Sequence, residues 1–339
     1  MTAKSVGETI LRVEDLRTHL DTKMGVVKAV DGVSFSLRQG ETLGIVGESG
    51  SGKSMTALSI LRLVPRPAAK IVGGRVLFKG EDLLDYNAEQ MRRVRGRHIS
   101  MVLQDPQTSL NPVYDIGSQI TEAIAMHRDV PRKELLRQAI ATLRQVRVAA
   151  PEQRVLDHPH QMSGGMKQRV VGAIAISCEP EILIADEPTT ALDVTIQAQY
   201  LRLLRDLQLQ TGLSIIFITH DFGIVAAMCD QVAVMYAGRV VELGPVRDIF
   251  RNPVHPYTQA LLNSVPAVDR PVERLYSIPG QPPMPWDLPH GCRFAPRCPV
   301  VERRCEATYP PTAPVRGAVA GEHDAACWKL EDAAWPPTS

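Results

Sequence analysis

The sequence of 339 residues lacks three features that would restrict the kind of protein it encodes. It has no apolar run near the roughly 20 residues that a membrane-spanning helix needs, so any membrane role must come through a partner. Its first residues contain no apolar signal core, and we therefore expect a cytosolic protein. It has no excess of charge of one sign, with 38 lysines and arginines against 37 aspartates and glutamates. This balance gives no indication of a nucleic-acid groove.

The chain also lacks an internal repeat and a low-complexity tract, but its residue types are unevenly distributed. Sixteen of the 26 prolines, all three tryptophans and four of the six cysteines follow residue 250. Before that point, strand-like and helix-like patterns alternate, which is typical of an α/β core. We therefore expect one domain over residues 1–250 and a small cysteine-containing extension over 251–339, with the proline-rich stretch 279–289 as a linker.

The first 250 residues predict a mostly parallel core sheet that is interrupted by a helical insertion at about 105–175. Short apolar runs are read as buried strands, and longer stretches with apolar residues three and four apart are read as helices. The expected strands are Leu43–Gly47, Arg75–Phe78, Ile99–Leu103, Ile182–Ala185, Ser214–Thr219 and Gln231–Tyr236. The expected helices are Ser54–Leu63, Ile116–His127 and Arg132–Val146.

Residues 47–54, Gly-Glu-Ser-Gly-Ser-Gly-Lys-Ser, match the phosphate-binding loop in its required strand-to-helix context. Glycines let the backbone wrap so that successive N–H groups converge on a phosphate. Lys53 reaches the β- and γ-phosphates as a point charge, and the Ser54 hydroxyl is placed to ligate Mg²⁺. The expected nucleotide contacts are Gly47, Glu48, Ser49, Gly50, Ser51, Gly52, Lys53 and Ser54.

Two acidic residues end a later apolar strand, where α/β folds present functional groups. We expect Asp186 to hold Mg²⁺ and Glu187 to accept a proton from an attacking water. Gln104 and His220 also follow strands, and their order along the chain favours contacts to Mg²⁺ and to the γ-phosphate. Each would be unremarkable alone.

A second phosphate-binding element lies at Met162–Arg169, which reads Met-Ser-Gly-Gly-Met-Lys-Gln-Arg. Ser163, Gly164 and Gly165 stand at a predicted helix start, where free backbone N–H groups and a hydroxyl face an anion. Two such elements in one domain indicate that one of them serves the nucleotide of a second subunit. We therefore expect a dimer.

Taken in order, these motifs resemble the ATP-binding subunits of ABC transporters. Residues 47–54 resemble the Walker A loop, Gln104 the Q-loop, and 162–166 the signature motif. Residues 182–187 resemble Walker B with its catalytic glutamate, 191–193 the D-loop with Asp193, and His220 the switch histidine. The stretches 26–35, 105–112, 255–258 and 291–299 are similar to the dipeptide/oligopeptide importer branch, which also includes nickel and glutathione importers. From this resemblance we expect di- or oligopeptides as the transported cargo, with nickel or glutathione as alternatives.

The resemblance implies ATP and Mg²⁺ as ligands and a set of partner proteins. These are a second ATP-binding subunit in a heterodimer, two transmembrane permease subunits and an extracytoplasmic substrate-binding protein, which place the chain at the cytoplasmic face of the cell membrane. A soluble ABC ATPase of DNA repair or translation is the rival. The single cassette and the absence of a long heptad run argue against it.

Two positions depart from the family pattern. An aromatic residue usually stacks on adenine ahead of the first core strands, but the stretch 16–20 offers only His19 or Leu20. We therefore expect either a modestly weaker nucleotide affinity or a contact of adenine with Val27. Met166 stands where many ABC proteins have glutamine, and it should leave the phosphate contacts of Ser163 intact.

Four cysteines cluster in the extension, with 5, 6 and 21 residues between them: Cys292, Cys298, Cys305 and Cys327. In a cytosolic chain such a cluster favours a metal site over disulfides. Thiolate chemistry leaves Zn²⁺, a [4Fe–4S] cluster and no metal open. The resemblance favours the iron–sulfur cluster. Cys178 and Cys229 are expected to be small buried hydrophobes.

Overall fold

The computed structural model describes residues 7–190, 192–265, 276–319 and 321–332. It divides into two compact units, which are described in turn. The first unit takes its described residues from 1–10, 37–42 and 85–218, and the second takes them from 11–36, 43–84 and 219–339. Across these described stretches, no helix has the length and apolar character to cross a bilayer.

Three parallel strands form the centre of the first unit, in the order β6 (Ile99–Val102), β7 (Ile182–Asp186) and β8 (Ser214–Ile218). Every residue of β7 and β8 is buried. Continuous apolar runs of this kind are expected where parallel strands are covered on both faces. All three strands agree with the sequence-based expectation to within one residue at each end.

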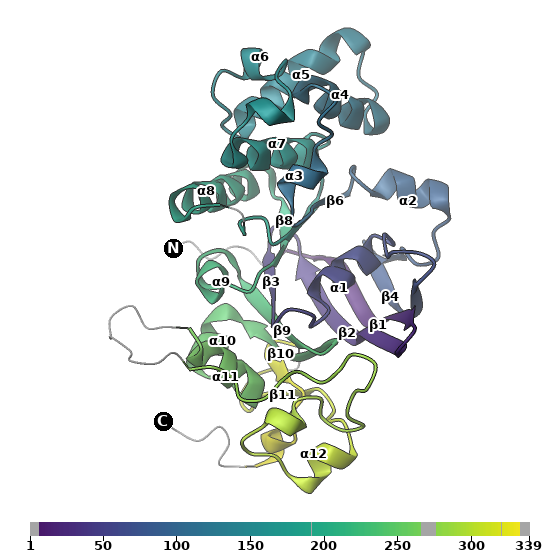
Figure 1. The fold of residues 1–339 in the computed structure, drawn as a ribbon, viewed down its shortest axis with the longest axis vertical. Coiled ribbons are helices and arrows are strands. Elements are labelled where there is room, and N and C mark those ends of the chain that lie inside the picture. Colours follow the sequence, from purple (N-terminus) through teal and green to yellow (C-terminus); the bar gives the residue numbers. More distant parts are fainter. Residues whose placement is uncertain (1–6, 191, 266–275, 320, 333–339) are drawn as a thin grey trace. The chain divides into compact units, whose positions relative to one another are not determined.

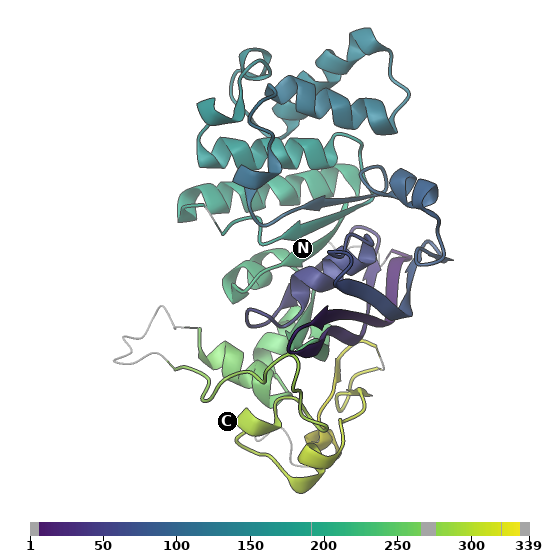
Figure 2. The ribbon, with the colours of Figure 1, turned by 45° about the vertical axis from the view of Figure 1, so that its right-hand side comes forward.

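Helices make up the rest of the first unit, and α4, α5 and α7 pack against one another (Figure 1). The Asp115 side chain caps α4 by accepting a hydrogen bond from the Ser118 amide at 2.7 Å. Figure 2 shows α7 and α8 running alongside each other. The helices are α2 (Ala88–Val94), α3 (Pro106–Ser109), α4 (Ile116–His127), α5 (Arg132–Gln145), α6 (Pro151–Arg154), η1 (Pro159–Gln161), α7 (Gly164–Ile176) and α8 (Val194–Thr211).

The second unit contains strands in the order β11, β12, β10, β9 and β3. Only β3 and β9 are parallel, and the remaining pairs are antiparallel, so the sheet is mixed. These strands are β3 (Thr42–Val46), β9 (Gln231–Tyr236), β10 (Arg239–Pro245), β11 (Ala313–Pro314) and β12 (Asp324–Ala325).

A separate antiparallel sheet of the second unit has the order β2, β1, β4 and β5, with strands β1 (Thr9–Thr22), β2 (Gly25–Arg38), β4 (Ala69–Phe78) and β5 (Glu81–Asp82). The expected strand Arg75–Phe78 is the end of β4, and it pairs with β1 instead of joining the parallel strands. The sequence pattern did not predict β1 or β2. Asp15, at a φ of 46°, lies within a register shift of β1 that interrupts its alternation of buried and exposed residues.

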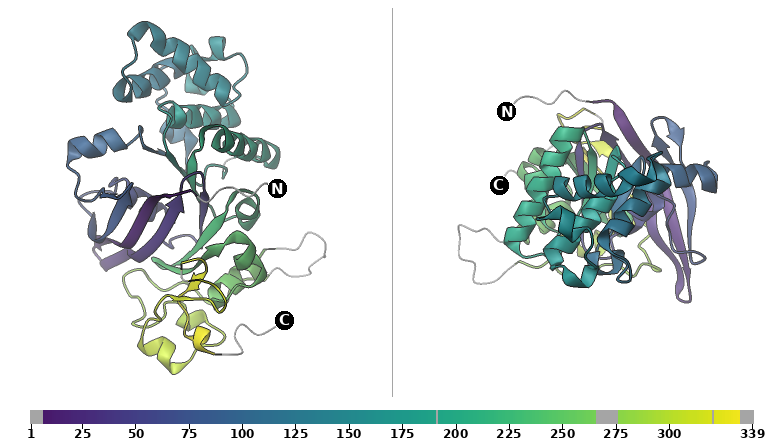
Figure 3. Two further views of the ribbon diagram at one scale, coloured as in Figure 1. Left: turned by 180° about the vertical axis from the view of Figure 1, so that it is seen from behind. Right: turned by 90° about the horizontal axis from the view of Figure 1, so that it is seen from above.

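The C-terminal part of the second unit, which Figure 3 draws in green to yellow, packs around three aromatic side chains. Tyr236, Tyr257 and Phe294 have ring centroids 4.5 to 5.3 Å apart and are almost fully buried. This cluster joins β9, α11 and the segment that carries the first cysteines. The helices of the unit are α1 (Lys53–Ile60), α9 (Phe222–Met228), α10 (Val246–Arg251), α11 (Pro256–Asn263), η2 (Ala295–Arg297), α12 (Arg303–Ala307) and η3 (Trp328–Glu331).

Candidate functional site

The phosphate loop of the second unit connects β3 to α1 and depends on two of its glycines. Gly47 has a backbone φ of 151° and Gly52 a φ of 102°, values that residues other than glycine rarely adopt. A Cβ atom at Gly47 would lie 2.1 Å from the Met235 carbonyl oxygen, and one at Gly52 would lie 2.2 Å from that of Ala29. Only glycine therefore permits both the turn and its close approach to the neighbouring backbone.

Polar side chains of the loop gather where a phosphate would bind. The Lys53 ammonium donates hydrogen bonds to the carbonyl oxygens of Gly47 (2.8 Å) and Glu48 (3.0 Å). The Ser51 hydroxyl is buried and has no hydrogen-bond partner in the described part of the chain. Ser54 is exposed in the first turn of α1. A buried cation and an unsatisfied hydroxyl fit an anionic ligand that carries acceptor oxygens.

A cavity of about 510 Å³ opens beside the phosphate loop, within the second unit. Its walls are residues 48–51 of the loop, residues 27–29 of β2, and 281–285 with Leu288 of the proline-rich linker. Val27 is therefore in the cavity wall, whereas His19 lies 3.8 Å from Asp31 and does not line it. The sequence pattern did not predict that the linker would be part of this cavity.

The first unit brings Gln104 and Glu187 together across 83 residues of sequence. The Gln104 amide donates a hydrogen bond to the Glu187 carboxylate at 3.1 Å, and the Thr190 hydroxyl donates to the same oxygen at 3.1 Å. Glu187 has a φ of 46°, so the chain turns sharply after the buried Asp186 at the end of β7. This turn presents a carboxylate next to a side-chain amide, an arrangement that suits the binding of a water molecule or a cation.

The signature segment, residues 162–166, contains the start of α7. Ser163 caps the helix, and its hydroxyl accepts a hydrogen bond from the Met166 amide at 3.4 Å. Ser163 and Gly164 are exposed, and a Cβ atom at Gly164 would meet no heavy atom within 4 Å. The N-terminus of this 13-residue helix is thus exposed, and anion binding there stays a prediction.

Two further predicted site residues lie at other helix starts. Asp193 caps α8 and accepts hydrogen bonds from the amides of Thr195 and Ile196 at 3.0 and 2.9 Å. Ala191 of the same motif lies outside the described residues. His220 is exposed just ahead of α9, in the second unit.

Sequence reasoning missed the residues that support the phosphate loop from the C-terminal region. Arg297 pairs with Glu48 at 2.8 Å, and the Glu48 amide donates to the Tyr257 hydroxyl at 2.9 Å. Tyr257 lies in the segment 255–258 that resembles the peptide-importer branch, so its motif was a usable signal. Arg297 is 249 residues from Glu48, and no local pattern indicates that pair.

The four cysteines of the extension are free thiols in one neighbourhood. Burial raises the pKa of Cys292 to about 11 and that of Cys327 to about 12, and the nearby thiols contribute to both shifts. Yet among the described residues no three histidine, cysteine or acidic side chains converge closely enough to hold a metal ion. The expected four-cysteine metal site is thus not formed as a ligand group here.

The remaining two cysteines lie apart from that neighbourhood. Cys178 is buried in the first unit, and its thiol donates to the Ala123 carbonyl oxygen at 3.4 Å. Cys229 is partly buried and packs against the hydrophobic core of the second unit, of which the aromatic cluster is a part. Burial raises the pKa of both thiols, as expected of small apolar side chains.

Comparison with known proteins gives consistent matches over nearly the whole chain. Residues 30–190 match the family described as ABC transporter, and 241–305 match the oligopeptide/dipeptide transporter C-terminal region. The chain is 52% identical over 333 residues to a probable peptide ABC transporter ATP-binding protein of Sinorhizobium fredii, covering 98% of each chain. It is 48% identical over 325 residues to a dipeptide transport ATP-binding protein of Bacillus subtilis, covering 96% of each.

A solved structure extends the agreement to the fold. The structure is a dimeric, post-hydrolysis ATP-binding cassette bound to ADP and phosphate; its TM-score is 0.63 at 25% identity, over 70% of this chain and 99% of that one. The predicted α/β cassette fold and the predicted family are therefore confirmed. The chain belongs to the ATP-hydrolysing, ATP-binding subunits of ABC transporters, in the branch with the oligopeptide/dipeptide C-terminal region.

Proposed function

We propose that this chain hydrolyses ATP to power the import of di- or oligopeptides across the cell membrane. The main evidence that the cargo is a peptide is the match of residues 241–305 to the C-terminal region of oligopeptide and dipeptide transporters. Relatives named for peptide and dipeptide transport match along almost their whole length, which supports the same cargo class. We place the boundary of the ATP-binding domain at residue 250 and the helical insertion at about 105–175.

The roles at the ATP follow from the chemistry of each side chain. Lys53 neutralises charge on the β- and γ-phosphates, and the amides of the phosphate loop donate to them. Ser54, Gln104 and Asp186 supply the oxygen atoms that Mg²⁺ prefers, and the ion offsets phosphate charge when bound. Glu187 accepts the proton of the attacking water. His220 donates a hydrogen bond to the γ-phosphate.

The signature segment serves the nucleotide of a second ATP-binding subunit. Ser163, with the amides of Gly164 and Gly165, binds the γ-phosphate across the dimer, and Asp193 lies near the same interface. The exposure of Ser163 and the open space at Gly164 support this role. Two permease subunits and a substrate-binding protein complete the transporter, with this chain on the cytoplasmic face. We expect the second ATPase to be a different chain.

Co-purification tests this function directly. The affinity-tagged chain, expressed in its own cells and extracted from membranes in mild detergent, should bring with it two permease subunits and one further ATPase. Mass spectrometry identifies these proteins. A chain that is recovered without any membrane protein, or bound to nucleic acid, would contradict the transporter function. Permeases of a nickel or glutathione importer would overturn the peptide cargo alone.

We also propose that the four extension cysteines hold a metal centre, with a [4Fe–4S] cluster favoured over Zn²⁺. Burial raises the pKa of Cys292, Cys298 and Cys327, and the neighbouring thiols of the extension contribute to these shifts, which supports a site where the cysteines gather. Because thiolates and not thiols bind metals, metal binding would release protons from these cysteines and would hold the thiolates together. The chemistry of four thiolates fits both metals.

Metal analysis of anaerobically purified protein separates these alternatives. We expect about four iron atoms per chain and a broad visible absorption band that reduction bleaches. Cys298→Ser should abolish both signals. Cys178→Ser and Cys229→Ser, outside the extension, should retain them and serve as matched controls. A zinc-only sample would overturn the cluster, and a metal-free sample would overturn the site.

A further inference from the structure

Arg297 of the C-terminal extension makes a bidentate contact with Glu48 of the phosphate loop. Its guanidinium donates to the two carboxylate oxygens of Glu48 at 2.8 and 3.1 Å. The Arg297 side chain is only 3% exposed, so solvent screens this pair weakly. Burial alone would lower the pKa of Arg297, but hydrogen bonds to Glu48 and Tyr236 raise it. A planar guanidinium that meets a carboxylate in this way fixes orientation as well as distance.

Glu48 is held at its backbone as well as at its side chain. Its amide donates to the Tyr257 hydroxyl at 2.9 Å, and its carbonyl oxygen accepts from Lys53 at 3.0 Å. Tyr257 is fully buried in the aromatic cluster, beside Phe294 at 5.3 Å between ring centroids. Glu48, the second residue of the phosphate loop, is therefore held by three groups that lie within the second unit.

The same guanidinium also fixes the start of the proline-rich linker. It donates to the carbonyl oxygens of Pro279 at 3.0 Å and Ile278 at 3.4 Å. The residues that follow, 281–285 and Leu288, line the cavity of about 510 Å³ together with residues 48–51 of the loop. One side chain thus joins the phosphate loop to the linker that faces it across the cavity.

We propose that Arg297 is a positioning residue for ATP: through Glu48 it sets the geometry of the phosphate loop, and through the linker it shapes the cavity beside that loop. The C-terminal extension is then part of the nucleotide site. This inference rests on the proposed binding of ATP by residues 47–54. Because the loop contacts the phosphates before and during hydrolysis, loss of this positioning raises KM for ATP more than it lowers kcat.

Arg297→Lys tests the proposal, because lysine keeps the charge but cannot make the bidentate contact. We expect KM for ATP, and the Kd of the full-length chain for a fluorescent ATP analogue, to rise about fivefold to tenfold, with kcat within about twofold of wild type. Glu48→Gln should have a similar effect. The double variant should be no worse than the more impaired single variant, since both substitutions remove one interaction.

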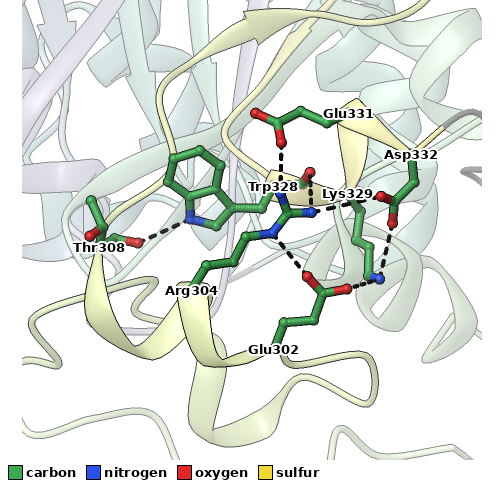
Figure 4. Close-up of polar contacts among 7 residues, drawn as sticks. All are labelled: Glu302, Arg304, Thr308, Trp328, Lys329, Glu331 and Asp332. Carbon is green, nitrogen blue, oxygen red and sulfur yellow. Dashed lines mark hydrogen bonds and ion pairs between the residues drawn. The ribbon is translucent and has the colours of Figure 1, made fainter.

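Arg304→Lys is the matched control, because Arg304 also directly precedes a cysteine of the extension. Its partners among the described residues lie within the extension: Glu302 at 2.9 Å, Glu331 at 2.6 Å, Asp332 at 3.7 Å and the Trp328 carbonyl oxygen at 3.1 Å (Figure 4). We expect this variant to bind ATP as wild type does. An equal rise in KM in this control would assign the effect to damage of the extension and would overturn the proposal.

Two other results are decisive. If Arg297→Lys and Glu48→Gln both bind ATP as the wild type does, or if their effects multiply in the double variant, Arg297 does not act through Glu48. If the wild type itself binds no ATP, the proposed function fails together with this inference. Should Arg297→Lys fail to fold, Glu48→Gln still removes the charge pair from the loop side and leaves the extension unchanged.

Discussion

Glu187→Gln is expected to reduce ATP turnover by about 10²- to 10⁴-fold while ATP binding is retained. Glutamine has the same shape as glutamate, and its carbonyl oxygen can still accept from Gln104 and Thr190, which lie 3.1 Å from the carboxylate. What it lacks is a group that accepts the proton of the attacking water. The variant should therefore accumulate as an ATP-bound dimer if, as we propose, hydrolysis reopens the pair of ATP-binding subunits.

Steady-state phosphate release and light scattering in the presence of ATP check this expectation. Glu181→Gln is the control, since Glu181 directly precedes the same strand β7 at its opposite end and pairs with His98 at 2.9 Å. It should hydrolyse ATP within about twofold of wild type. Wild-type turnover in Glu187→Gln would show that another group activates the water.

Ser163→Arg should stop hydrolysis at the nucleotide of the partner subunit and spare the nucleotide held by Lys53 of its own chain. The exposed Ser163 hydroxyl and the open space at Gly164 leave room for the long side chain at the N-terminus of α7. Arginine there would occupy the place of the phosphate. Loss of the helix cap costs about 1 kcal/mol, too little to unfold a domain of this size.

Labelling each subunit separates the two sites. With a photoreactive ATP analogue trapped by vanadate during turnover, Ser163→Arg should remove the label from the partner ATPase and retain it on this chain. Lys53→Ala is the reciprocal control and should give the opposite pattern. Loss of the label from this chain in the Ser163→Arg complex would mean that the signature segment serves its own nucleotide.

The sequence predicted those parts of the molecule whose signal is local. Residues 47–54 require glycine at positive φ, and the buried run of β7 ends in two carboxylates, so both features can be recognised without a structure. The antiparallel strands β1 and β2 could not be recognised, because the register shift at Asp15 interrupts the alternation that identifies strands. Strand pairing also decided that Arg75–Phe78 joins this sheet.

The features that the sequence did not predict depend on contacts between residues that are far apart in the sequence. The pair of Arg297 with Glu48 spans 249 residues, and neither side chain has a local reason to be paired. The composition of the proline-rich stretch predicts a linker, but composition gives no information on the cavity that residues 281–285 line. The cysteine spacing predicted that the four thiols gather, but the positions of the sulfur atoms depend on the folded extension.

The most direct test of the account is the uptake of a radiolabelled peptide by cells that lack the gene for this chain. Wild type and Glu181→Gln should restore uptake, whereas Glu187→Gln, present at the same level in the membrane, should not. Peptide uptake that survives deletion of the gene, or that Glu187→Gln restores in full, would contradict the central claim that ATP hydrolysis by this chain drives peptide import.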